Sequence, residues 1–311
     1  MSNLITVIIS VFGYIIIGYI IGKSNFFSKK YLKIFDKISF NILLPLSLIS
    51  NFWLIKFPEI IINELLISFF GSGIIIFIIS FLIGKKIYEF KTDDCAIFGL
   101  GSCFGNSVAF GIPLMYSILD PVKVMPYMIL VLFHGMIHFT YTTLIIETYR
   151  NRLQSNSKRI FKTILGLAQN IVLFGMFIGF FLNFMNIPFP EKLQNVLIPV
   201  SKVALPAILI SLGIALSGFQ IAKNLKYSLI LTLLKNFLHP LIAFIFAKYI
   251  LMMSPLLIFI VTIAAALPSG SQTYYFSYRY NSLQKIISAN VVISTFVSFF
   301  TISFLLVLLN Y

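Results

Sequence analysis

The amino-acid sequence predicts an all-α membrane protein with ten transmembrane helices in two inverted five-helix repeats, the fourth and ninth helices being broken. Three observations predict this fold: an apolar composition, ten apolar runs of spanning length, and an internal repeat. Of 311 residues, 59% are hydrophobic and 10% are charged, and the mean hydropathy is +1.00. A soluble domain carries about 25% charged residues. The composition therefore excludes a soluble globular protein.

The apolar runs contain about 20 residues each, which is the length that crosses the hydrocarbon core as a helix. We place the ten spans at 4–22, 34–53, 64–84, 94–118, 124–146, 165–184, 194–217, 226–250, 255–278 and 286–309. The first run has no basic residue before it and several after it. A cleaved signal peptide has the reverse pattern, so we expect this run to remain as the first span.

The basic residues set the expected orientation. The loops after spans one, three, five, seven and nine hold 17 Lys and Arg residues, and the loops on the other side hold four. Loops rich in Lys and Arg stay in the cytoplasm, so we expect both termini outside a bacterial-type cytoplasmic membrane. The net charge of +14 lies in these short loops. It therefore indicates membrane topology rather than nucleic-acid binding.

The chain repeats itself at an offset of 161 residues. Residues 44–50, LPLSLIS, match residues 205–211, LPAILIS, at five of seven positions. The same offset carries every span of the first half onto one of the second half. Chance similarity between apolar sequences is the alternative. Because each half has an odd number of spans, we expect an inverted repeat: residues 1–149, a basic cytoplasmic linker at 150–163, and residues 164–311.

Both broken spans contain small polar residues, Gly and Pro. Gly and Pro disrupt helices, and paired interruptions mark transporter sites. We expect the half-helices to restart after Pro113 and Pro268 and to present positive N-terminal ends to an anion. The expected substrate-binding residues are Asn106, Ser107, Gly111, Pro113, Pro268, Ser269, Ser271, Gln272, Thr273 and Tyr274. The alternative is that the small residues only allow helices to pack closely. It applies less to Asn106 and Gln272, because amides inside a span need partners.

A charge or proton role is open to Lys235, His134 and His239. Lys235 is an ionisable residue within a span, which is a functional hypothesis by default, although snorkelling to the interface is the alternative. His134 and His138 share a helical face, and the alternative for the histidines is that they are satisfied interior residues. Cys95 and Cys103 have no metal-ligand spacing around them. We expect no metal and no cofactor.

The residues that carry these features also resemble a known family. Residues 105–114, GNSVAFGIPL, are similar to the span-four motif of the auxin efflux carrier family, whose bacterial members include malonate- and malate-type carriers. Leu44-Pro45, Leu205-Pro206, Leu267-Pro268-Ser269 and residues 278–281, YRYN, are similar to it as well. The resemblance covers essentially the whole chain. It implies that spans four and nine cross at their breaks and that one bundle moves, elevator-like, against a scaffold. The linker is short, whereas plant members of the family have a long central loop at this place.

The sequence as a whole predicts a secondary transporter of a small carboxylate that works by alternating access and is coupled to a proton or to sodium. A sodium-coupled symporter of a larger organic anion is one alternative. The others are a serine-type intramembrane enzyme using Ser269, Ser271 and His239, a membrane subunit of a larger complex, and a channel. We expect no enzyme, because no nucleophile motif is present. The apolar outer faces are compatible with lipid and with a homodimer.

Overall fold

The fold is taken from a computed structural model, which describes residues 2–24, 26–54, 62–150, 171–219 and 225–309. Regular secondary structure within these ranges is helical. Five helices are long and apolar enough to cross a membrane, and shorter apolar helices accompany them. The predicted all-helical membrane protein is thus confirmed. The expected linker beyond Arg150 and the expected start of span six lie outside the described residues.

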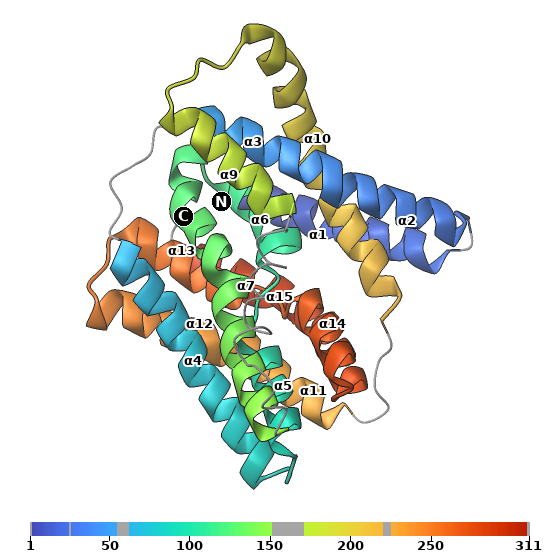
Figure 1. Cartoon of the computed structure of the whole chain (residues 1–311), viewed down its shortest axis with the longest axis vertical. Coiled ribbons are helices and arrows are strands. Elements are labelled where there is room, and N and C mark those ends of the chain that lie inside the picture. The colour runs from blue at the N-terminus through green and yellow to red at the C-terminus, as the bar shows by residue number, and fades with distance from the viewer. Residues whose placement is uncertain (1, 25, 55–61, 151–170, 220–224, 310–311) are drawn as a thin grey trace.

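One group of helices gathers around α10 (Glu191–Ser217) in the upper part of Figure 1. α1 and α3 both pack against α10, and α3 also packs against α9. The other members are α1 (Ser2–Lys23), α2 (Lys29–Ile38), η1 (Ser39–Leu43), α3 (Leu44–Leu54) and α9 (Ile171–Phe184). We call this the α10 group.

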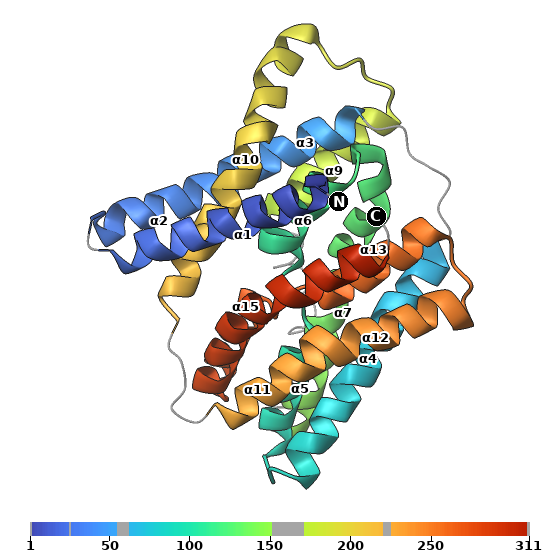
Figure 2. The ribbon, with the colours of Figure 1, turned by 180° about the vertical axis from the view of Figure 1, so that it is seen from behind.

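The remaining helices form a second group, and Figure 2 shows it from behind. α4 packs against α5, α7 and α12, and α11 packs against α15. Its members are α4 (Ile62–Lys86), α5 (Thr92–Cys103), η2 (Ser107–Gly111), α6 (Ile112–Ile118), α7 (Pro121–Tyr149), α11 (Lys226–Leu233), η3 (Leu234–Leu238), α12 (His239–Ile245), η4 (Phe246–Ile250), α13 (Pro255–Ala266), α14 (Ser271–Tyr280) and α15 (Gln284–Leu308). We call this the α5–α13 group. It meets the α10 group where α6 and α15 contact α1.

Three π-helical turns are each followed closely by a proline. η1, η2 and η3 end two residues before Pro45, Pro113 and Pro240, respectively. Proline has no N–H, and its ring clashes with the carbonyl four residues earlier. A π turn moves the hydrogen bonding by one residue and relieves that clash. The helices therefore continue past these prolines.

Two glycines, Gly18 and Gly179, allow close helix contacts in the α10 group. A Cβ placed on Gly18 would lie 2.0 Å from the carbonyl oxygen of Ile210, and one placed on Gly179 would lie 2.7 Å from that of Ile49. Both distances are too short for any side chain, so glycine is required at each. Small residues allow close backbone approach between membrane helices. These contacts fix α1 on α10 and α9 on α3.

At one end of the α5–α13 group, polar side chains join three helices. The Arg150 guanidinium donates to the Asp93 carboxylate (Nε to Oδ2, 2.9 Å) and to the carbonyl of Tyr280 (3.0 Å). The Tyr280 hydroxyl donates to Glu147 over 3.3 Å. The side chains of Arg150 and Asp93 are 21% and 12% exposed, so the ion pair is largely shielded from water. It ties the start of α5 to the ends of α7 and α14.

Candidate functional site at the crossing of two broken helices

The breaks in the two interrupted helices lie against one another. Extended backbone follows α5 and follows α13, and an antiparallel bridge pairs Gly105 with Ser269. We call residues 104–106 together with 268–270 the crossover. The two breaks that the sequence predicted are thus brought together in space.

The backbone groups freed at each break are satisfied by the other break. The amide of Asn106 donates to the carbonyl of Pro268 over 2.8 Å, and the amide of Gly270 donates to the carbonyl of Phe104 over 2.9 Å. Irregular backbone within a membrane is tolerated only where protein or a water-filled cavity satisfies it. The crossover meets this requirement with two backbone hydrogen bonds.

In both broken segments a helix restarts directly after the crossover. η2 begins at Ser107 and α14 begins at Ser271. The sequence placed the first restart after Pro113, but this proline lies inside the restarted helix, in the first turn of α6. The reason is the π turn before it, which accommodates the proline without a break. The positive helix ends therefore lie at Ser107 and Ser271, close to the crossover.

Asn106 has a buried side chain without a partner. It is 1% exposed, and within the described residues neither its Oδ1 nor its Nδ2 has a hydrogen-bond partner. Gln272, in the first turn of α14, likewise has an unpartnered Oε1. A buried polar group without a partner costs about 1–3 kcal/mol. Such groups at a helix start point to a ligand that would supply the missing bonds.

Three of the predicted hydroxyl groups near the crossover have partners in the protein. Ser107, Ser269 and Thr273 are buried, and each donates to a backbone carbonyl. The acceptors are Gly105 for Ser107 (3.3 Å), Gly101 for Ser269 (3.1 Å) and Gly270 for Thr273 (2.6 Å). These side chains stabilise the crossover in this state.

Ser271 and Tyr274 are half-buried on the first turn of α14. The ring of Tyr274 packs edge-on against Phe219 from the end of α10, with centroids 4.9 Å apart. Tyr274 thus lies where the two helix groups meet. Gly111 is fully enclosed, because a Cβ there would lie 1.8 Å from the Tyr127 hydroxyl.

Three residues that hold the crossover or the helix ends beside it were not predicted. The Tyr127 hydroxyl donates to the carbonyl of Ser107 over 2.6 Å. Ser294 accepts from the amide of Ser269 (2.9 Å), and the Asn290 amide donates to the carbonyl of Gly101 (2.9 Å). Asn290 carried a usable signal, since an amide inside a span needs partners. The sequence holds no feature that separates Tyr127 and Ser294 from ordinary residues of a span.

Lys235 lies beside the crossover and is 0% exposed. Its Nζ donates to the carbonyl of Ala265, in the last turn of α13, and lies 3.4 Å from Nδ1 of His239. A Cβ on Gly105 would lie 3.6 Å from this Nζ. A snorkelling lysine places its ammonium at the membrane interface. Lys235 instead turns inward, towards the backbone at the crossover.

All the histidines of the chain gather around the same place. His134 and His138 on α7 have ring centroids 4.6 Å apart, and each histidine ring lies within 6.5 Å of the Phe69 ring. Nε2 of His134 lies 3.2 Å from the carbonyl oxygen of Gly105. His134 therefore contacts the crossover from α7, and Lys235 lies beside it on η3. His239 contacts Lys235 rather than the crossover.

Neither a serine-type catalytic site nor a metal centre is formed here. The Ser269 hydroxyl donates to a backbone carbonyl, and in the described part of the chain no hydrogen bond joins Ser269 or Ser271 to His239. No three His, Cys, Asp or Glu side chains among the described residues are arranged to hold a metal ion. The arrangement offers hydrogen-bond donors, helix ends and one buried amine.

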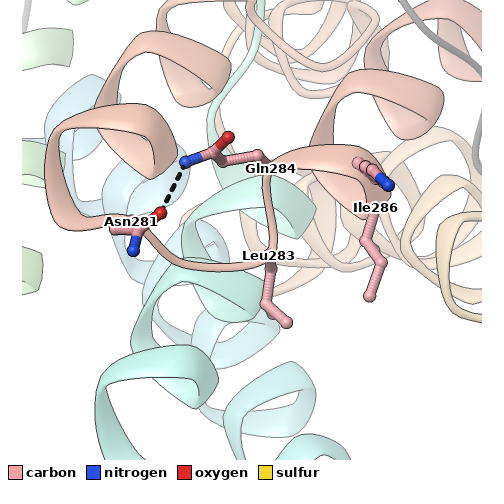
Figure 3. A pocket seen from close by; sticks show the side chains of 5 residues that line it. Asn281, Leu283, Gln284 and Ile286 are labelled. Carbon is pink, nitrogen blue, oxygen red and sulfur yellow. Dashed lines mark hydrogen bonds between the residues drawn. The ribbon is translucent and has the colours of Figure 1, made fainter.

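A surface pocket lies elsewhere, at the turn between α14 and α15. Its lining residues are Asn281, Leu283, Gln284, Lys285 and Ile286. Figure 3 shows the Gln284 amide bonded to Asn281, at 3.0 Å. The pocket is formed by consecutive residues of one turn and includes none of the predicted site residues.

Comparison with known proteins identifies the family. Residues 3–306 match the family described as "Membrane transport protein". A protein of Rhizobium meliloti (strain 1021) named "Putative malonate transporter" is 20% identical over 251 residues, which cover 79% of this chain and 77% of that protein. The matched family is a transporter family and not an enzyme family. The chain therefore belongs, over nearly its whole length, to this membrane transport family of auxin efflux carriers.

Proposed function

We propose that this chain is a secondary active transporter of a small organic anion, a mono- or dicarboxylate, that works by alternating access. The observation that carries this proposal is the Asn106 side chain, which is buried and unpartnered at the crossover. A carboxylate would accept from its Nδ2, and a hydroxyl or a protonated acid would donate to its Oδ1. The relative named as a malonate transporter supports the choice of a carboxylate.

The anion would bind between the two restarted helices. Helix N-termini carry unpaired N–H groups and a positive partial charge, and together they form an anion site without a cation. Ser107 and Ser271 begin these helices. Gln272 and Tyr274 would be further contacts, while Ser269, Thr273, Gly111, Pro113 and Pro268 shape the site. Discontinuous helices place anionic substrate groups in this way in other transporters.

The architecture we propose is ten spans in two inverted repeats, residues 1–149 and 164–311, joined by the linker at 150–163. Two packing contacts support it. Gly18 approaches Ile210 and Gly179 approaches Ile49, and these pairs exchange with one another under the 161-residue offset. A single ancestral contact, made twice with the halves exchanged, accounts for both. Repeats of opposite orientation place the substrate site at their interface.

The moving part would be the α5–α13 group, which holds both crossing helices, and the α10 group would be the scaffold. The protein would lie in a bacterial-type cytoplasmic membrane with both termini outside. Tyr274 packs against Phe219 across the two groups, so elevator-like movement would break this contact. The coupling ion would be a proton or sodium, and a homodimer remains compatible with the apolar outer faces.

The proposal is tested by uptake of labelled malonate, malate, lactate and an indole acid into proteoliposomes that contain the purified protein. Saturable uptake of one acid, competed by its relatives, is expected. Asn106→Ala should reduce uptake about tenfold or more, because it removes a hydrogen bond to a charged group inside the site. Gln194→Ala is the matched control, since Gln194 donates to Phe189 at the far end of α10. Normal uptake by folded Asn106→Ala protein would overturn the site.

A further inference from the structure

Lys235 is a buried amine that forms no ion pair with any described residue. It is 0% exposed, and in the part of the chain that the structure describes no carboxylate lies within ion-pair distance of its Nζ. A buried charge is costly unless it is paired. The charged form of Lys235 therefore lacks the counter-ion that a purely structural lysine would have.

The backbone around Lys235 has the character of a cation site. Its Nζ bonds to the carbonyl of Ala265, in the last turn of α13. The C-terminal end of a helix carries a negative partial charge. In transporters with discontinuous helices, such ends and unwound carbonyls coordinate a coupling sodium ion. Here an ammonium of the protein itself takes a position of that kind.

Lys235 lies beside the residue that precedes Asn106 in the crossover. A Cβ built on Gly105 would lie 3.6 Å from the Lys235 Nζ, and Asn106 is the next residue along the chain. The amine and the expected anion-binding amide thus lie at adjacent parts of the crossover backbone. Within a protein a unit charge is felt over such a distance.

The titratable groups that face Lys235 carry no fixed negative charge. They are His239 on the adjoining α12, His134 and His138 on α7, and Cys103 on α5. The described residues of α4, α13 and α15, which also pack against η3, add no titratable group to this set. The charge beside the crossover therefore depends on protonation of Lys235 and its histidine neighbours.

We propose that Lys235 is the proton-coupling residue of this transporter and occupies the position of a coupling sodium ion. The proposal rests on the proposed function. A proton from water binds the Lys235 amine and gives the ammonium, which favours one carboxylate charge at Asn106. The substrate-loaded site then moves across the membrane, and the ammonium and the carboxylate neutralise one another. After release of the anion the ammonium returns its proton to water, and the neutral empty carrier goes back.

In this cycle net uptake and exchange place different requirements on Lys235. Net uptake requires the empty carrier to return, and so requires Lys235 to lose its proton. Exchange of internal for external substrate uses only the loaded carrier. Lys235→Arg keeps a permanent cation, so it should retain counterflow of labelled malonate, or of the acid that the wild type carries, while net uptake driven by a proton gradient falls about tenfold or more.

The experiment compares wild type, Lys235→Arg, Lys235→Gln and the control Lys202→Gln in proteoliposomes, with net uptake and counterflow measured at several pH values. Lys202 is an exposed lysine on α10, and its variant should behave as wild type. Lys235→Gln should lose the pH dependence of KM for the anion, because no proton then enters the site. Wild-type uptake should carry protons inward, read with an internal pH dye, and should not require sodium.

Net proton-driven uptake by Lys235→Arg at the wild-type rate would overturn the proposal, as would sodium-dependent uptake by the wild type. If Lys235→Arg fails to fold, the pH profile of Lys235→Gln and the wild-type proton and sodium measurements decide in its place. Absence of uptake of every acid by the folded wild type would overturn the proposed function, and this proposal with it. Failure of the coupling proposal alone leaves wild-type uptake intact.

Discussion

At the scale of single residues, Gly111 and Tyr127 show how tightly the restarted helix is held. A Cβ on Gly111 would lie 1.8 Å from the Tyr127 oxygen and 2.7 Å from Leu267. Tyr127 in turn donates to the carbonyl of Ser107, where the helix restarts. The glycine therefore allows the tyrosine to reach and fix the end of the helix that faces the site.

Gly111→Ala should lower the free energy of unfolding by about 1–3 kcal/mol, because the added methyl group overpacks this contact. The measurement is the melting temperature in detergent. Adding Tyr127→Phe should recover part of the loss, since it removes the atom nearest to the new methyl group. Equal losses in the single and double variants would show that the tyrosine oxygen is not the obstacle.

The sequence identified Asn106 because an amide inside a span needs partners. The same argument would have identified Asn290, whose amide donates to Gly101 and whose Oδ1 accepts from Thr232 over 3.0 Å. The position of the first restart was not predictable in this way. A proline after a π turn and a proline at a true break have the same local sequence, and only the packing around them separates the two.

At the scale of helices, each predicted apolar run overlaps helix in the part of the chain that the structure describes, and five of these helices are long and apolar enough to cross a membrane. Apolar length decides where a helix can cross, so composition alone predicts most boundaries. The packing partners of each helix could not be predicted in this way. Apolar runs of similar composition do not indicate which helix lies against which, and the contacts of Gly18 with Ile210 and of Gly179 with Ile49 became visible only in three dimensions.

Gly18→Ala should destabilise the protein, because its methyl group would meet the backbone of Ile210. The matched control is Gly13→Ala on the same helix, where a Cβ would meet nothing within 4 Å. That control should be neutral or stabilising by up to about 1 kcal/mol, since alanine favours helix over glycine. The melting temperatures of the two variants compare them directly. Equal shifts would contradict the close contact of α1 with α10.

The contribution of the Arg150–Asp93 ion pair to stability can be measured with single and double variants. Arg150→Ala and Asp93→Asn should each cost about 1.5–3 kcal/mol, because each removes hydrogen bonds to a charged and largely buried group. The double variant should cost less than the sum, as for residues that share one interaction. Lys123→Ala is the control, since Lys123 and Asp120 are 51% and 78% exposed and exposed ion pairs contribute little. Additive losses would show that the two residues act separately.

At the scale of the whole molecule, the proposed orientation can be measured with two exposed loop positions. Phe26 is 84% exposed after the first span, and Met252 is 82% exposed after the eighth. In intact cells a membrane-impermeant maleimide should label Met252→Cys and not Phe26→Cys, because the basic loops stay in the cytoplasm. The native Cys95 and Cys103 are buried and should not react. The opposite labelling pattern would reverse the proposed topology.

The histidine cluster has a consequence for spectroscopy. The chain contains three histidines, and all of them lie within the same buried cluster beside the crossover. Incorporation of isotope-labelled histidine therefore places the imidazole signals of these 311 residues in one small volume. A spectrum recorded during turnover would report the hydration and tautomers of that volume.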